Sequence, residues 1–144
     1  MKFLKLIFAF ILVSTSSSLL SGQTIQKVSD GIVYSTPGGK GEKIKLKVWS
    51  DNIIQVIANP TGTFSARESL IITEKPVSTP DWKVLETDKL VEVSTNSITT
   101  RIDKLTSKIE FVDKAGKLIM AENGRELHPA KVVGEDCFHI KQSF

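Results

Sequence analysis

The sequence has few of the side chains from which most enzymatic and metal sites are built. Its 144 residues include one cysteine and two histidines. A single cysteine forms no disulfide within the chain, and neither histidine has a second histidine or cysteine at the spacing of a zinc site. We therefore expect no metal site and no bound cofactor.

The chain also lacks an excess of charge of one sign. The formal net charge is +3, and the lysines are scattered along segments in which they alternate with apolar residues. Proteins that bind nucleic acid usually gather their basic residues on one face, because contacts to phosphates dominate the affinity. We therefore expect no nucleic-acid partner.

Long apolar runs are missing beyond the N-terminus. The run Leu6–Val13 follows Lys2 and Lys5 and precedes a serine-rich stretch. This order is typical of a secretory signal, and the run is too short for a transmembrane helix. We expect residues 1–22 to be a signal peptide, with an uncleaved anchor as the alternative, and residues 23–144 to be exported to the periplasm or the extracellular space, free of the membrane.

What the sequence does have is alternation of apolar and polar residues, clearest in Ser97–Met120. Ile98–Ile102 and Lys108–Val112 alternate with a period of two, which places one face in a core and the other in water. Asp113–Gly116 fits a tight turn, because aspartate favours its first position and glycine accepts a positive φ. With Lys117–Met120 returning, this stretch predicts an antiparallel meander.

The rest of the mature chain has the same character, and no helix is predicted. Further strands are expected at Thr24–Val28, Ile32–Ser35, Lys43–Trp49, Ile53–Ala58, Leu70–Thr73, Trp82–Glu86, Leu90–Val93, Glu126–Val133 and Asp136–Phe144. Two neighbouring pairs, Lys43–Ala58 and Trp82–Val93, are expected to form hairpins. Short strands with regularly spaced turns are typical of sandwiches and barrels, so we predict an all-β antiparallel sandwich of about ten strands.

The residues that can perform chemistry have simpler explanations. Pro129 weakens the expected pairing of Glu126–Val133, and Glu126 is the nearest carboxylate to His128 in sequence, so we expect His128 to be an exposed loop histidine. Cys137 and His139 share one face of the last strand, where a half-buried cysteine is more common than a nucleophile. No serine lies in a G-x-S-x-G elbow. We therefore predict no catalytic residue.

Aromatic residues are also few, at 7% of the chain. Those that could stack on a sugar ring are Tyr34, Trp49, Phe64 and Trp82. Large aromatic side chains in β-sandwiches belong more often to the core or its rim. We therefore expect core or rim positions for these residues, with a sugar-stacking platform as the alternative.

Four stretches carry a family resemblance. They are DGIVYST (Asp30–Thr36), KIKLKVWSDNIIQVIANP (Lys43–Pro60), TFSARESLII (Thr63–Ile72) and NSITTRIDKLTSKIEFVDKAGKLIM (Asn96–Met120). In this order they resemble the N-terminal β-sandwich of bacterial glycoside hydrolase family 31, which contains α-glucosidases and α-xylosidases. The resemblance extends from about Gln26 to Phe144 and rests on hairpin patterns rather than on catalytic motifs.

The resemblance implies a galactose-mutarotase-like sandwich that packs against a (β/α)8 barrel. Enzymes of this family retain the anomeric configuration and carry their two catalytic aspartates in that barrel, so no catalytic residue can be assigned to this chain. Phe144 stands inside an expected strand. We therefore expect residues 23–144 to be a sandwich domain that is truncated before the barrel.

Three functions follow from these observations. The first is the non-catalytic sandwich of an exported α-glycosidase that hydrolyses terminal α-glycosidic bonds in oligosaccharides. The alternative is a freestanding secreted module that binds carbohydrate or has a structural role. A third, a mutarotase-like enzyme, needs a histidine base and a carboxylic acid in one cleft, and the two histidines are poorly placed for that.

Overall fold

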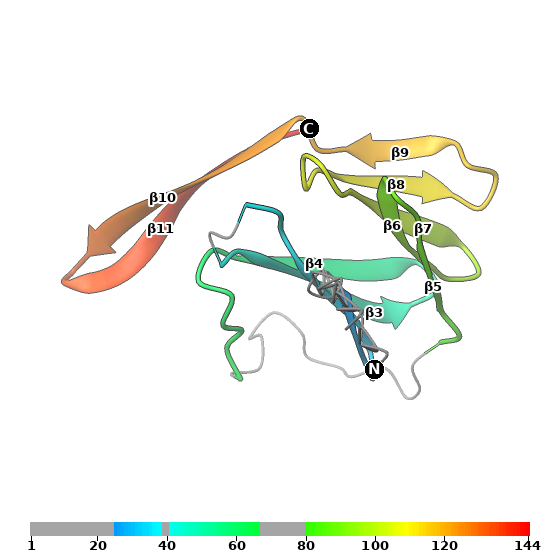
Figure 1. The fold of residues 1–144 in the computed structure, drawn as a ribbon, viewed down its shortest axis with the longest axis horizontal. Coiled ribbons are helices and arrows are strands. Elements are labelled where there is room, and N and C mark those ends of the chain that lie inside the picture. The colour runs from blue at the N-terminus through cyan, green and yellow to red at the C-terminus, as the bar shows by residue number, and fades with distance from the viewer. Residues whose placement is uncertain (1–24, 39–40, 67–79) are drawn as a thin grey trace, which may run out of the picture.

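The computed structural model describes residues 25–38, 41–66 and 80–144, and these form 11 β-strands and no α-helix (Figure 1). The strands are β1 (Ile25–Val28), β2 (Gly31–Ser35), β3 (Lys43–Ser50), β4 (Ile53–Asn59), β5 (Lys83–Glu86), β6 (Leu90–Ser94), β7 (Ile98–Asp103), β8 (Ile109–Asp113), β9 (Leu118–Ala121), β10 (Gly124–Val132) and β11 (Glu135–Ser143). The predicted all-β class is confirmed. The expected signal peptide and the expected strand Leu70–Thr73 lie outside the described residues.

The strands form three antiparallel units. The first sheet has the order β1-β2-β3-β4, and the second sheet has the order β5-β6-β7-β8-β9. The third unit is the C-terminal hairpin, β10-β11, which extends away from the two sheets (Figure 1). Both predicted hairpins and the predicted meander are therefore present. Within the described ranges, no helix is long and apolar enough to cross a membrane.

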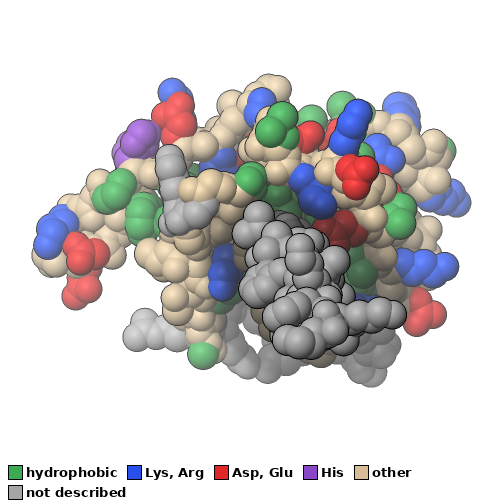
Figure 2. All heavy atoms as spheres, in the orientation of Figure 1, with side chains coloured by type: hydrophobic (Ala, Val, Ile, Leu, Met, Phe, Trp, Pro, Cys, Tyr) green, Lys and Arg blue, Asp and Glu red, His purple; other side chains and the backbone are tan. Residues whose placement is uncertain are grey.

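The two sheets pack face to face because each strand buries every second side chain. In β3, Ile44, Leu46 and Val48 are at most 2% exposed, while the lysines between them are partly exposed. They join one apolar cluster with residues of the second sheet such as Val91 and Ile102. This shared core makes the structure a β-sandwich, as predicted. On the outer surface, charged side chains of both signs are interspersed (Figure 2).

Two turns confirm the sequence-based predictions. Gly31 begins β2 so close to β3 that a Cβ atom there would collide with the carbonyl oxygen of Leu46. In the β8–β9 turn, Gly116 has a φ of 82°, and its N–H donates to the Asp113 carbonyl at 2.9 Å. The Asp113 carboxylate also accepts the N–H groups of Ala115 and Lys117, at 2.8 and 2.9 Å. The aspartate and the glycine thus have the roles that the turn pattern assigns to them.

Polar contacts join the sheets at the edges of the core. The Tyr34 hydroxyl donates to the backbone carbonyl of Lys104 at 3.2 Å. The Thr95 hydroxyl, in the β6–β7 turn, donates to the carbonyl of Asp51 in the β3–β4 turn at 2.6 Å. These bonds are directional, whereas the apolar core between them is not, so they help to fix how one sheet lies over the other.

Replacing Thr100 by valine should stabilise the protein. Thr100 is 0% exposed, and its hydroxyl has no hydrogen-bond partner among the described residues. A buried polar group without a partner costs about 1–3 kcal/mol, and valine has nearly the same shape. We expect Thr100→Val to raise the free energy of unfolding by about 1 kcal/mol in urea denaturation.

The neighbouring Thr99 supplies the matched control. Its hydroxyl donates to the Ser94 hydroxyl at 2.9 Å, so Thr99→Val should lower stability or leave it unchanged. A destabilised Thr100→Val variant would show that the hydroxyl is satisfied in solution.

The titration of Tyr34 should report the packing of the two sheets. Burial raises the pKa of Tyr34 above its ordinary value of 10.0, because the tyrosinate would lose its hydration. The folded pKa therefore exceeds the unfolded one, so this contribution to stability is complete below about pH 10 and is lost as the pH rises through the folded pKa.

Tyr34 is the one tyrosine of the chain, so tyrosinate absorbance reports it alone. We expect a titration midpoint above 10.0 in the native protein and a return to the ordinary value in denaturant. Equal midpoints in the two conditions would contradict the burial of this hydroxyl.

Candidate functional site

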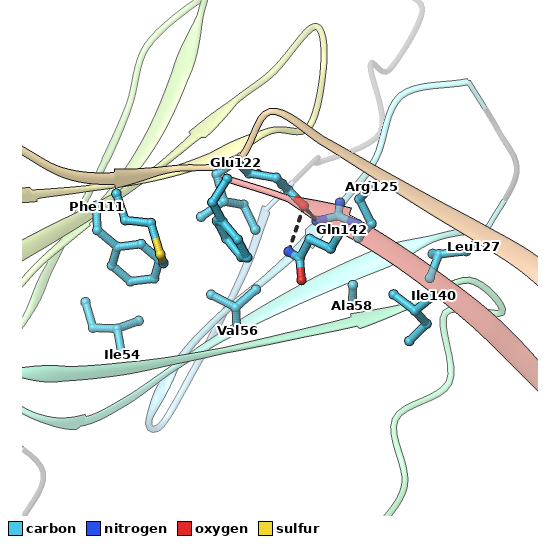
Figure 3. Close-up of a pocket in the computed structure, with 12 residues that line it drawn as sticks. Ile54, Val56, Ala58, Phe111, Glu122, Arg125, Leu127, Ile140 and Gln142 are labelled. Carbon is cyan, nitrogen blue, oxygen red and sulfur yellow. Dashed lines mark hydrogen bonds and ion pairs between the residues drawn. The ribbon is translucent and has the colours of Figure 1, made fainter.

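A groove lies between the sandwich and the C-terminal hairpin (Figure 3). This groove has a volume of about 390 Å³. Its floor is formed by Ile54, Val56 and Ala58 of β4, and the hairpin contributes Leu127 and Ile140. These strands supply apolar side chains on one face, so the walls of the groove are largely apolar.

The groove is open, and much of its apolar lining faces solvent. Met120 is 40% exposed, Ile140 is 58% exposed and Phe144 is 61% exposed. Single exposed apolar residues are ordinary, but a contiguous patch of them marks a surface that another molecule or domain covers. The groove therefore has the character of an interaction surface.

One end of the groove is polar and strongly buried. The side chains of Glu122 and Arg125 are 1% and 10% exposed. Arg125 Nη1 donates to the two carboxylate oxygens of Glu122 at 2.9 and 3.1 Å, and Gln142 Nε2 donates to Glu122 Oε1 at 2.9 Å (Figure 3). Burial of a carboxylate is tolerated when a cation and hydrogen bonds compensate for its lost hydration.

The same cluster extends to both sheets. Arg125 Nη2 donates to the carboxylate of Glu42, just before β3, at 3.3 Å and contacts the carbonyl of Ser107 at 3.5 Å. The backbone N–H of Ile109 in β8 donates to Glu122 Oε2 at 3.2 Å. Arg125 and Glu122 therefore connect the hairpin to both sheets, and neither Glu122 oxygen is left for an acid–base role.

The structure corrects the expected position of His128. His128 lies within β10 rather than in a loop, because Pro129 is accommodated in the hairpin opposite Phe138. Proline is tolerated in edge strands, and both strands of a two-stranded unit are edges. The expected exposure is confirmed, with the His128 side chain 64% exposed. Its Nε2 atom lies 3.1 Å from Glu126 Oε2, the carboxylate that the sequence indicated.

The register of the hairpin brings the two histidines together. His128 pairs directly with His139, and Cys137, a free and half-buried thiol, pairs with Ala130. The signal for this register is the Val133–Gly134 turn, in which both residues have a positive φ, at 52° and 83°. Valine is a rare residue in such a turn, so the sequence pattern does not indicate this hairpin. In ranges 25–38, 41–66 and 80–144, no group of three or more histidine, cysteine, aspartate or glutamate residues is arranged to hold a metal ion.

Two of the aromatic residues considered for sugar stacking, Tyr34 and Trp82, belong to the core or pack against it. The four considered for sugar stacking are Tyr34, Trp49, Phe64 and Trp82. Tyr34 is fully buried, and Phe64 is half-buried. The Lys47 ammonium lies 4.0 Å from the ring centre of Trp49. The Lys27 ammonium lies 4.7 Å from the ring centre of Trp82, and this ring also packs against the core. A lysine therefore covers one face of each tryptophan ring, which favours the structural interpretation for these two residues.

Comparison with known proteins identifies the fold. No protein-family model matches the chain. The chain is similar to the solved structure of a glycoside hydrolase family 31 α-xylosidase from Xanthomonas citri, with a TM-score of 0.70 and 28% sequence identity over 81% of this chain. The predicted resemblance to glycoside hydrolase family 31 is confirmed. The similarity covers 13% of the Xanthomonas enzyme, so this chain spans a small part of such a protein.

A second solved structure shares the fold. It is an uncharacterized protein of Listeria monocytogenes in complex with α-D-glucose, β-D-glucose, magnesium and calcium. Its TM-score is 0.53 and its identity 20%, over 69% of this chain and 9% of the Listeria chain. At that identity the likeness shows the fold alone.

Removing Arg125 should destabilise the protein far more than removing an exposed cation from the same strand. Arg125→Met leaves the buried Glu122 without its cation, and the loss of one partner of a buried pair costs about 3–5 kcal/mol. We expect this loss in the free energy of unfolding, measured by urea denaturation.

Lys131→Met in β10 is the matched control. Lys131 pairs with Asp136 at 3.3 Å, but the two side chains are 73% and 87% exposed, so the free energy of unfolding should change little. Equal effects of the two substitutions would mean that the Glu122–Arg125 pair is hydrated in solution.

Proposed function

We propose that this chain is the non-catalytic β-sandwich domain of an exported α-glycosidase of glycoside hydrolase family 31. The observation that carries the proposal is the likeness to the Xanthomonas α-xylosidase, at 28% identity over 81% of this chain. The parent protein would be a retaining enzyme that hydrolyses terminal α-glycosidic bonds in oligosaccharides, with its catalytic carboxylates on a (β/α)8 barrel beyond this chain.

The chemistry beside the groove supports a non-catalytic role. A retaining glycosidase needs two carboxyl groups about 5–5.5 Å apart that are open to the sugar. The two carboxylates that meet at the polar end of the groove, Glu42 and Glu122, are both bound to Arg125. Glu122 also accepts bonds from Gln142 and from the backbone of Ile109. These bonds favour a structural role for both carboxylates.

The apolar part of the groove supports packing against another part of the parent protein. Leu127 and Ile140 face β4 across an open space (Figure 3), and the exposed Phe144 also lines the groove. Filling this space would bury the apolar side chains of the hairpin that are now exposed, which is favourable by about 25 cal/mol per Å². We propose that the barrel or the chain that leads to it packs here, and that the sandwich helps to wall the substrate pocket.

Export is proposed from the N-terminal segment. Residues 1–22 have the charged, apolar and small-residue regions of a secretory signal. Mass spectrometry of the protein recovered from the periplasm or the medium should give a chain that begins after Ser21 or Gly22. A cytoplasmic protein that keeps Met1 would contradict export and leave the rest of the proposal intact.

The parent activity is tested by comparing two proteins from the same gene. The reading frame should continue past the codon for Phe144, and the longer product should hydrolyse aryl α-xylosides or α-glucosides. The 144-residue chain should not hydrolyse them. A stop codon at this point, or hydrolysis by the 144-residue chain itself, would contradict the proposal. In the first case, calorimetry with oligosaccharides would test the alternative of a freestanding carbohydrate-binding module, with Trp82→Ala and Phe64→Ala as variants.

The packing of the groove has its own test. Ile140 lines the groove and is 58% exposed, whereas Val132, on the opposite face of the hairpin, is 59% exposed. If the groove is filled in the parent protein, Ile140→Asp should destabilise that protein by about 2 kcal/mol or more, because it buries a charge in an apolar contact. The same substitution in the 144-residue chain should have a small effect, as should Val132→Asp in either protein. A parent protein that tolerates Ile140→Asp would show that the groove stays open.

A further inference from the structure

The outward face of the C-terminal hairpin carries side chains that can bind a metal ion. The proposed function does not use them. Cross-strand partners point to the same side of a sheet, so the pairs His128–His139 and Glu126–Lys141 share one face. Leu127 and Ile140 lie on the other face, toward the groove. In the space-filling view, histidine atoms are visible on the hairpin at the outer surface of the molecule (Figure 2).

The register brings the two imidazoles within reach of one ion. Directly paired residues in antiparallel strands have their Cβ atoms about 4.5–5.5 Å apart. Zinc–nitrogen bonds are about 2.0–2.1 Å long, so two rings that lean toward each other can bind the same cation. Both histidines are solvent-exposed, so the ion has a free path to them.

Glu126 determines which ring nitrogen of His128 is free to bind a metal ion. The Oε2 atom of Glu126 faces His128 Nε2, and a carboxylate accepts hydrogen bonds but does not donate them. The Nε2 atom of His128, 3.1 Å away, must then carry the hydrogen, and the lone pair lies on Nδ1. A carboxylate that accepts the second ring N–H is the usual outer partner of a metal-binding histidine.

We propose that His128 and His139 form a two-histidine site for a late first-row divalent cation such as Zn²⁺ or Cu²⁺, with Glu126 as the positioning residue. Imidazole nitrogens suit these ions, whereas Mg²⁺ and Ca²⁺ prefer oxygen ligands. Within the described residues, no third histidine, cysteine, aspartate or glutamate completes the site, so water or a donor from another molecule fills the remaining positions. Such a site is open, and it joins the two strands of the hairpin.

Calorimetric titration of the untagged 144-residue chain with Zn²⁺ tests the proposal directly. The chain has two histidines, so each single substitution leaves one imidazole. We expect saturable binding of one Zn²⁺ per chain and tighter binding of Cu²⁺, as the affinity order of these ions requires. Mg²⁺ should not bind. The affinity should fall as the pH is lowered, because protons compete for the same nitrogens.

Substitutions then separate the histidines from other donors. His128→Ala and His139→Ala should each weaken Zn²⁺ binding by about tenfold or more, and Glu126→Gln should weaken it less. Val132→Ala, on the same face but four pairs along the register, is the matched control and should bind as the native chain does. Circular dichroism checks that each variant keeps its strands.

A second readout follows from the position of the site. Because the ion would join β10 to β11, saturating Zn²⁺ should slow amide hydrogen exchange around the Val133–Gly134 turn, and His139→Ala should remove this effect. Native affinity in both histidine variants would overturn the proposal. Loss of binding in Cys137→Ser with retention in His139→Ala would also overturn it, because the ion would then be held by the thiol.

Discussion

Burial of one face of each sheet against the other is the constraint on which the rest of this structure depends. A lone sheet would leave its apolar face in water, and each side chain such as Leu46 or Ile102 gains about 1.5–3 kcal/mol from burial. The shared cluster fixes which face of every strand points inward. Once these faces are set, the lysines of β3 and the turn residues can lie only on the outside.

Hydrophobic burial sets the faces but not the relative position of the three units. Directional contacts at the edges of the core restrict that position, and among them is the buried Glu122–Arg125 pair. It joins the hairpin to both sheets through Gln142, Glu42 and the backbone of Ile109. Buried charges add little net stability compared with apolar side chains, but they tolerate very few arrangements of their partners. We interpret the pair as the element that holds the hairpin at a defined angle to the sandwich.

The hairpin therefore presents two faces with different chemistry. Its inner face forms one wall of an apolar groove, which our proposal assigns to contact with the rest of a family 31 enzyme. Its outer face carries the paired histidines, remote from that contact. A strand alternates between its two sides, so a single hairpin can serve both purposes without conflict. The two proposals rest on opposite faces and can fail independently.

The sequence by itself determined the strands, their inward faces and the best-defined turns. Alternation in Lys43–Trp49 and the Asp113–Gly116 turn are local signals, because a period of two and a positive φ involve neighbouring residues. The family resemblance rested on the same local hairpin patterns, and the solved α-xylosidase structure agrees with it. These parts of the fold needed no knowledge of distant contacts.

Only the tertiary structure decided what meets across the molecule. The buried cluster around Glu122 draws on residues from Glu42 to Gln142, which no local pattern connects. The pairing of His128 with His139 depends on a turn at Val133–Gly134 whose first residue is unusual for its backbone angles. A shift of one residue in that register would exchange the two faces of the hairpin. Alternation in the sequence indicates that each strand has two different faces. The register of the strand pairing and the packing of the sheets determine which residues from different strands share a face.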